Sequence, residues 1–172
     1  FEELYSEGIR EISSTELSAR LGALANSKSS ILYWTNRNNI PVFVPGLTDG
    51  AVGSQIWLFS QKRRDFKIDL LKDEAHLSDI VFDANHSGAL IIGGGISKHH
   101  TLWWNQFKGG LDYAVNITSA VEWDGSLSGA AVREAVSWGK VKPKARKVTV
   151  RGEATTIIPF MIEALLNRLG KS

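Results

Sequence analysis

The segment EAVSWGK, residues 134–140, brings a carboxylate, an indole and an amine close together in the chain. Glu134 and Trp138 are four residues apart, which places both side chains on one face if the segment is an α-helix. Gly139 suits the left-handed position that ends a helix, so Lys140 is expected just beyond that face. A lysine packed against this indole and partly removed from water favours its neutral amine, which can attack a carbonyl or imine carbon. The local sequence by itself favours the alternative, a lysine that the helix dipole stabilises at a helix C-terminus.

Three consecutive glycines, Gly93–Gly95, join an apolar run to a helical pattern. Backbone without Cβ atoms can approach a phosphate closely, and the N-terminus of the next helix offers N–H donors. We interpret the turn as a ligand site, although a tight turn is the alternative and the spacing is not GxGxxG. His99 and His100 follow, but adjacent helical positions point about 100° apart and do not readily share one ion. We therefore predict no metal site. One of these histidines either binds or deprotonates a substrate amine, or is an ordinary surface residue.

Two aspartates, Asp49 and Asp124, precede glycines in loops that follow strand-like segments. Each carboxylate could accept hydrogen bonds from a ribose or an amine, whereas each alone is typical of an Asp-Gly turn. Two such loops at strand ends in one sheet indicate a site.

The elements that carry these residues alternate between strand and helix. We expect helical spacing in 1–25, a buried strand in 40–46, a strand and a helix in 66–84, a strand–glycine–helix unit at 88–110, strands at 111–120 and 147–152, and helices at 126–139 and 155–170. This order predicts an α/β fold, a Rossmann-like, mostly parallel sheet with helices on both faces, forming a single domain over residues 1–172. Ligands in such folds bind at the carboxyl ends of the strands.

The composition narrows the classes of function. The chain has 172 residues, a formal net charge of +2 and no cysteine, so disulfide scaffolds and thiolate sites are excluded. The basic run KVKPKARK at 140–147 is a weak argument for nucleic-acid binding, and no apolar run reaches the roughly 20 residues of a membrane span. We expect a cytoplasmic protein that binds neither nucleic acid nor membrane.

Five segments occur in one order over about residues 31–160: IPVFVPGLTDG, GALIIGGGISKHH, GLDYAV, EWDGSLSGA and EAVSWGK. Together they resemble deoxyhypusine synthase, and GGGISKHHTLWWNQFK is similar to its archaeal branch. The resemblance implies an NAD-dependent transferase that moves the aminobutyl group of spermidine, through an imine on a lysine, to a lysine of translation initiation factor 5A. It implies that Lys140 carries the intermediate, that Glu134, Trp138 and His99 belong to the polyamine pocket, and that Asp49, Gly94, Ser119, Ala120 and Asp124 contact NAD.

The chain departs from the family pattern in three ways. Members are about twice as long, and the front half that supplies part of the NAD site is absent here. The chain then corresponds to the C-terminal half, either as a fragment or with the other half as a separate chain. Ser54 and Leu127 occupy positions where better-known members have acidic residues that hold polyamine ammonium groups. Losing two carboxylates removes charge-assisted hydrogen bonds, so the pocket should hold spermidine differently or prefer another amine such as agmatine.

Three functions stay open from the sequence. The first is the catalytic half of a deoxyhypusine synthase, and the second is a non-catalytic subunit of such an enzyme. The third is a small-molecule aminobutyltransferase, for example one that forms homospermidine. The resemblance implies a homo- or hetero-tetramer, with sites built across subunit contacts.

Overall fold

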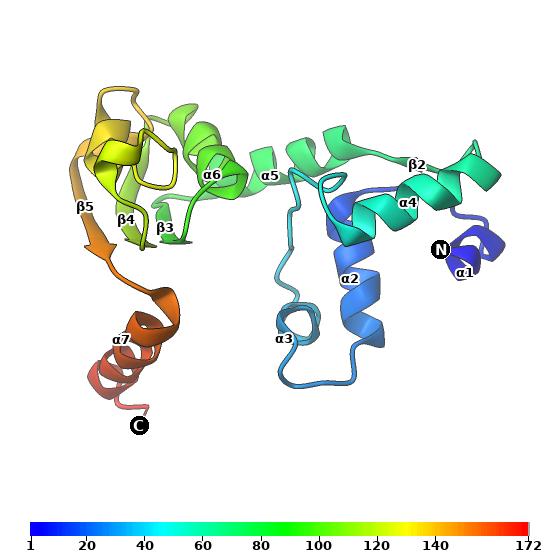
Figure 1. Ribbon diagram of the computed structural model, residues 1–172, viewed down its shortest axis with the longest axis horizontal. Helices are drawn as coiled ribbons and strands as arrows, with labels where there is room; N and C mark the ends of the chain where they lie inside the picture. The colour runs from blue at the N-terminus through cyan, green and yellow to red at the C-terminus, as the bar shows by residue number, and fades with distance from the viewer. Residues whose placement is uncertain (172) are drawn as a thin grey trace. The chain divides into compact units, whose positions relative to one another are not determined.

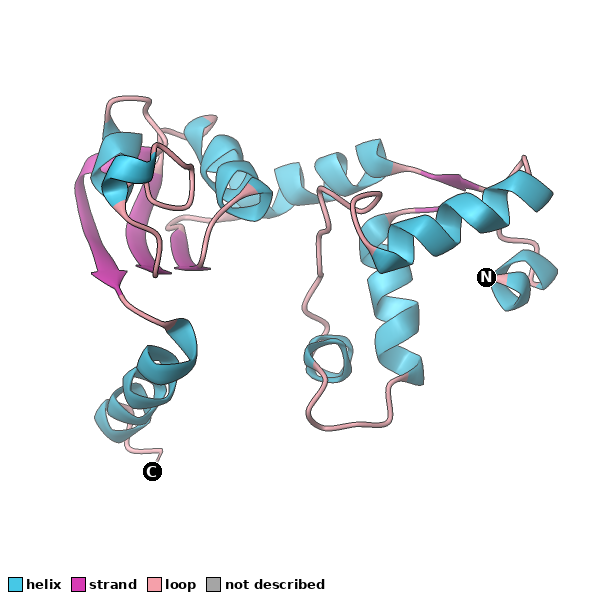
Figure 2. Cartoon of the chain, in the orientation of Figure 1, coloured by secondary structure: helices cyan, strands magenta, loops and turns pink. Residues whose placement is uncertain are grey.

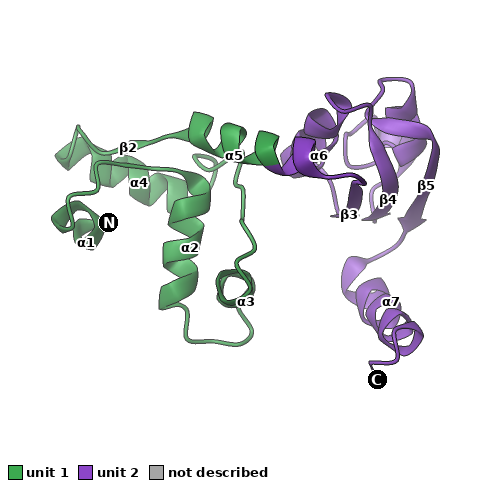
Figure 3. Ribbon diagram, turned by 180° about the vertical axis from the view of Figure 1, so that it is seen from behind, with its two compact units in different colours: residues 1–79 green, residues 80–172 purple. Residues whose placement is uncertain are grey.

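The computed structural model describes residues 1–171, which form two compact units (Figure 3). Unit 1 comprises residues 1–79 and unit 2 begins at residue 80. The prediction of one domain over the whole chain stays a prediction, and each unit is described by itself.

Unit 1 is mainly helical and holds one short parallel pair of strands (Figure 1). Its elements are α1 (Glu2–Ser6), β1 (Glu11–Ile12), α2 (Ser14–Leu24), α3 (Ile31–Arg37), α4 (Ala51–Lys62), β2 (Lys67–Ile68) and most of α5 (Leu70–Asp83), with β1 paired to β2.

The start of α2 is fixed by two sets of hydrogen bonds. Ser13 and Glu16 form a capping box, in which each side chain accepts from the other residue's backbone N–H. The buried Asp73 of α5 accepts from the backbone N–H groups of Ser14 and Thr15 at 2.8 and 3.0 Å. These bonds join α5 to α2 across 58 and 59 residues of sequence. The apolar core of unit 1 consists of Leu4, Ile12, Leu17, Leu47, Ile56, Phe59 and Phe66.

The strand predicted in residues 40–46 is wrong, because this run pairs with no other part of the described chain. The backbone N–H of Val44 instead donates to the Ser14 side chain at 3.0 Å. An apolar run rich in β-branched residues becomes a strand only where a neighbouring strand supplies backbone partners.

Unit 2 is built on a three-stranded parallel sheet in the order β3-β4-β5 (Figure 2). The predicted α/β class and parallel sheet are therefore confirmed. Its elements are β3 (Gly88–Ile92), α6 (Ile96–Gln106), β4 (Leu111–Thr118), the 3₁₀ helices η1 (Glu122–Asp124) and η2 (Val132–Val136), β5 (Val141–Arg151) and α7 (Ala154–Arg168).

One face of this sheet is covered by α6 and η2. Leu102 of α6 and Val132 and Ala135 of η2 pack with Ile91 of β3 and Ala114 of β4 in one buried cluster. Because the strands are parallel, the loops that follow β3 and β4 leave the sheet at the same edge. The predicted ligand loops, at Gly93–Gly95 and after Thr118, lie at this edge.

The helix predicted over residues 126–139 is largely wrong, since only Val132–Val136 is helical, as a 3₁₀ helix. The residues before it make turns instead: the Ser126 hydroxyl accepts from the Gly129 N–H at 3.0 Å. A Cβ on Gly129 would lie 2.1 Å from the carbonyl oxygen of Val121, so the loop folds back tightly on itself. Short serine and glycine residues satisfy the backbone locally here and compete with a regular helix.

Candidate active site

The backbone of Lys140 is fixed from both sides. At the end of η2 the Lys140 N–H donates to Ala135 and the Gly139 N–H donates to Val136, both at 3.0 Å, which is the Schellman pattern. Gly139 has φ of +68°, the left-handed conformation predicted for it. The carbonyl of Lys140 accepts from the Leu111 N–H at 3.0 Å, at the beginning of β4. The lysine is thus held at the junction of η2, β4 and β5.

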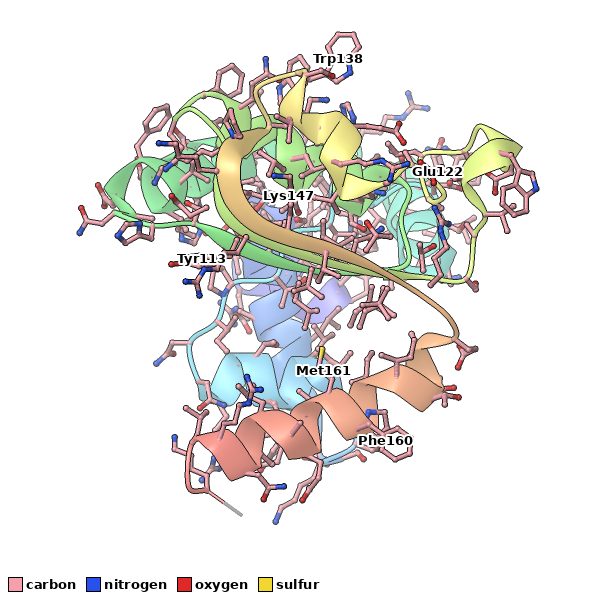
Figure 4. The ribbon with its side chains drawn as sticks, turned by 90° about the vertical axis from the view of Figure 1, so that its left-hand side faces the viewer. Tyr113, Glu122, Trp138, Lys147, Phe160 and Met161 are labelled. Atoms are coloured by element: carbon pink, nitrogen blue, oxygen red, sulfur yellow. The ribbon has the colours of Figure 1, made fainter. Side chains whose placement is uncertain are left out.

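A cavity of about 150 Å³ in unit 2 gathers three of the predicted site residues, Glu134, Trp138 and Lys140. The 3₁₀ helix η2 ends at Val136, before Trp138, so Glu134 and Trp138 do not share one helical face as predicted. They reach the same cavity because the chain turns after η2. Trp138 is 71% exposed and projects outward (Figure 4). The other lining residues are Lys98, Leu102, Leu127, Ala130, Ala131, Val132 and Ala135.

Trp103 of α6 also lies against Lys140, and it is a residue to which the sequence pattern did not point. The Nζ atom of Lys140 is 5.5 Å from the centroid of the Trp103 ring. His99, one helical turn earlier, stacks on the same indole with ring centroids 5.7 Å apart and planes at 27°. His99 and Lys140 are therefore brought together through Trp103. The spacing of four between His99 and Trp103 was the signal that could have found this residue.

Lys98 is a second residue that the sequence analysis missed. Its side chain is 2% exposed and lines the cavity, and its Nζ donates to the carbonyl oxygens of Leu127 at 2.9 Å and Ala130 at 2.7 Å. Burial lowers the pKa of Lys98, the nearby Glu134 carboxylate opposes this shift, and Arg151 adds to it. The signal in the sequence is a lysine four residues before Leu102, on the core face of α6.

Residues 119–131, which we name the β4–η2 loop, contain three predicted NAD contacts, Ser119, Ala120 and Asp124. The Arg151 guanidinium donates to the carbonyls of Ala120 at 2.5 Å and Gly129 at 3.4 Å. Asp124 accepts from the Ser126 N–H at 2.7 Å, and its hydrogen bonds to Ser126 lower the pKa of the Asp124 carboxyl. This is the Asp-Gly turn that the sequence offered as the alternative. The carboxylate of Asp124 has two acceptor oxygens, so this turn does not exclude a contact with NAD, which stays a prediction.

Each of the three glycines after β3 has a reason within the chain itself. Gly93 and Gly95 have φ of +78° and +79°, a conformation that glycine adopts at little cost. A Cβ on Gly94 would lie 2.4 Å from the Cα of Ser128, so Gly94 permits close packing of the β4–η2 loop. The turn therefore does not by itself require a ligand, and the predicted NAD contact of Gly94 stays a prediction.

Asp49 lies in unit 1, exposed in the turn before α4, where its N–H donates to the Gly46 carbonyl at 3.0 Å. Ser54, on the first turn of α4, donates its hydroxyl hydrogen to the Gly50 carbonyl at 3.1 Å. The predicted part of Asp49 in NAD binding stays a prediction.

The structure contains no cluster of three or more His, Cys, Asp or Glu side chains suited to a metal ion within residues 1–171. Over the same residues, no helix has the length and apolar character needed to cross a membrane.

Comparison with known proteins places these features in a family. The model of the deoxyhypusine synthase family matches residues 1–165. A protein named "Probable deoxyhypusine synthase" from Thermoplasma acidophilum is 57% identical over 165 residues, which cover 96% of this chain and 53% of the relative. Another of that name, from Ignicoccus hospitalis, is 47% identical over 180 aligned residues, covering 99% of this chain and 56% of the relative.

The fold is also similar to that of a crystal structure of a candidate deoxyhypusine synthase from Entamoeba histolytica. The TM-score is 0.63 at 23% sequence identity, over 90% of this chain and 45% of the other. The chain spans about half the length of the curated relatives that it matches.

Proposed function

This chain belongs to the deoxyhypusine synthase family, and from that premise we propose that it is the part of such an enzyme that forms the covalent intermediate. The observation that supports this best is the shared cavity of Glu134, Trp138 and Lys140. A nucleophilic amine, a carboxylate and an apolar wall are what the transfer of an aminoalkyl group requires.

Lys140 is the proposed nucleophile. Its neutral amine attacks the imine carbon of the oxidised donor, the carbon–nitrogen bond to the donor's remaining amine breaks, and that amine leaves with a proton. The aminobutyl group is then held as an imine on Nζ. The amine of the acceptor lysine attacks the same carbon and releases Lys140 unchanged. Glu134 is placed by η2 to hold the ammonium group of the amine or to carry a proton between the nitrogen atoms.

NAD is the proposed cofactor, and when bound it takes up a hydride from the donor amine and returns it to the product imine. The chain's own residues fit part of such a site. A Cβ on Gly93 or Gly95 would meet open space. Gly95 precedes α6 as its N-cap and offers no side-chain cap, so the first N–H groups of the helix can receive a phosphate. Ser119 and Ala120 follow β4 at the same sheet edge. With half of the family's length, we expect weak NAD binding by this chain alone.

The donor is proposed to be spermidine or a related amine. Of the described residues that line the cavity, Glu134 is the only carboxylate, and it lies among two lysines, Lys98 and Lys140. Leu127 lines the cavity where better-known members of the family have an acid. The small number of carboxylates in the cavity is the observation that favours a second candidate function, a non-catalytic subunit.

The proposed acceptor is a lysine of translation initiation factor 5A, which would place the reaction in the cytoplasm. We propose that a chain segment equivalent to the N-terminal half of the family acts with these residues, in a homo- or hetero-tetramer.

Replacing Lys140 by Arg tests the proposal. Arginine keeps the positive charge but forms no imine, so transfer to the acceptor should be lost while the thermal unfolding curve stays the same. Transfer is measured with the N-terminal half of a family member present, and normal product yield in the variant would exclude Lys140 as the carrier.

Reduction with borohydride separates the catalytic chain from a non-catalytic subunit. Labelled spermidine and NAD are added with the N-terminal half, and the trapped mass is located by peptide mass spectrometry. Label on Lys140 is expected for the catalytic chain, whereas an unlabelled Lys140 in a mixture that still turns over would support the non-catalytic subunit.

A further inference from the structure

The ring of Trp103 lies beside Lys140 and has no role in the proposed transfer steps. It lies 5.5 Å from the Nζ atom of Lys140, within the range of about 6 Å in which an aromatic face attracts an ammonium group. Trp138, the indole predicted for this role, is the more exposed of the two, at 71% against 45% for Trp103. α6 therefore supplies an indole to Lys140 in addition to Trp138, which lines the same cavity.

The ring orientation of Trp103 is fixed by its neighbours on the same helix. His99 stacks on it from four residues before. Phe107, the C-cap residue of α6, meets it edge-on from four residues after, with centroids 6.0 Å apart and planes at 89°. Residues at this spacing lie on one face of an α-helix. The three rings form a row, which we name the α6 aromatic row, and Lys140 lies against its central member.

An aromatic face binds a cation without accepting a proton and without carrying a charge of its own. The attraction is worth about 0.5–1 kcal/mol at an exposed site and about 2 kcal/mol where water is removed. The cavity needs such an attraction because two lysines and one carboxylate line it. An amine that carries several positive charges therefore meets little compensating charge from the described lining residues.

We propose that Trp103 is a binding residue of the amine site, whose ring face holds alkylammonium groups. In the free protein the ring holds the ammonium of Lys140. When Lys140 gives up its proton to act as nucleophile, the ring loses this cation and can receive an ammonium group of the bound amine. This inference rests on the proposed function and adds a substrate contact to it.

The first test measures how strongly Trp103 shields the Lys140 amine in this chain without any added partner. Trp103→Leu removes the ring, Trp103→Phe keeps a smaller one, and Trp57→Leu is a matched control that removes an exposed tryptophan of α4. The rate at which acetic anhydride labels Lys140 is followed by peptide mass spectrometry. We expect labelling about 2- to 5-fold faster in Trp103→Leu, an intermediate rate in Trp103→Phe and the wild-type rate in Trp57→Leu. Equal rates in the wild type and Trp103→Leu would overturn the contact.

The second test measures binding of spermidine by calorimetry to the same four proteins. Loss of the ring should weaken the affinity about 2- to 30-fold in Trp103→Leu, with partial recovery in Trp103→Phe. An unchanged Kd in Trp103→Leu, or a wild-type chain without saturable binding, would overturn the proposal. Neither measurement depends on turnover. Transfer activity retained by Lys140→Arg would remove the proposed function and leave both results standing, so the two failures are distinguishable.

Discussion

At the scale of single residues, Gly94 can be required either for packing within the chain or for close approach of a ligand, and the structure favours packing. Its φ lies outside the left-handed region, so alanine is acceptable to the backbone at this position. The added Cβ would nevertheless meet the Cα of Ser128 at 2.4 Å, a backbone atom that cannot move without the β4–η2 loop.

Gly94→Ala is therefore expected to destabilise the protein by about 1–3 kcal/mol in the absence of any ligand. Urea unfolding measures this difference. Gly50→Ala is the control, because a Cβ on Gly50 meets nothing within 4 Å and its φ of 174° is ordinary extended backbone. If Gly94→Ala unfolds like the wild type and loses only NAD affinity, close approach of a ligand is the reason for this glycine.

Asp112 gives a prediction about pH. Its carboxylate accepts from the Lys142 Nζ at 2.6 Å and from the Ser87 N–H at 3.0 Å, so it joins β4 to β5 and to the loop before β3. The bond to Lys142 and then that to Ser87 lower the pKa of Asp112 to about 2. A carboxyl with a lowered folded pKa stabilises the protein above its unfolded pKa of about 3.9, and this stability is lost as the pH falls toward 2.

Asp112→Asn should therefore lower the melting temperature at pH 7, and the gap to the wild type should narrow between pH 4 and pH 2. Thermal melts at pH 7, 4 and 2 measure the gap. A gap of constant size over this range would show that the carboxylate charge is not the source of the stability.

At the scale of elements, the β4–η2 loop is held by cations from two neighbours. Lys98 of α6 and Arg151 at the end of β5 together donate to four carbonyl groups of the loop, those of Ala120, Leu127, Gly129 and Ala130. Backbone carbonyls that face the protein need donors, and long cationic side chains can reach several of them. The loop conformation thus depends on residues remote from it in sequence.

Lys98→Met keeps the apolar stem and removes the donor, so the loop should open while the sheet stays folded. Loss of the charge also removes the cost of its burial, which limits the change in the free energy of unfolding to about 1–2 kcal/mol. Hydrogen exchange should accelerate at the amides of Gly129 and Ala130, which donate to the Ser126 carbonyl. Unchanged exchange at these amides, with the β4 amides as reference, would contradict this role.

The same elements explain which predictions from the sequence succeeded. The strand–glycine–helix unit of β3 and α6 could be predicted because its apolar run, its glycines and its helical spacing all indicate the same structure. The strand predicted in 40–46 was wrong, because a strand depends on partners that a local pattern does not reveal. The helix predicted over 126–139 was largely wrong, because Ser126 and Gly129 make local turns that compete with a helix. The sequence likewise pointed only to Trp138 as the indole beside Lys140, whereas the fold also brings Trp103 of α6 to this lysine.

At the scale of the whole molecule, the decisive fact is that the chain spans about half of its relatives' length. Within unit 2, four large side chains of the sheet keep about half of their surface exposed. They are Leu90 (52%), Ile92 (53%), Tyr113 (51%) and Val148 (50%). Parallel sheets are normally covered on both faces, so we expect additional protein to cover these residues in the working assembly.

Native mass spectrometry tests this expectation. The chain has a mass of 18.9 kDa, and we expect species that are multiples of this mass, or that include a second chain when the protein is isolated from its own source.

Leu90→Lys is the informative variant. A charge on this half-exposed position should weaken association, because burying an unpaired lysine is costly, while the melting of the separate chain changes little. A wild-type chain that remains monomeric at micromolar concentration, and that does not associate with the N-terminal half of a family member, would refute a shared assembly. Equal association by Leu90→Lys and the wild type would instead show that the contact lies elsewhere on the chain.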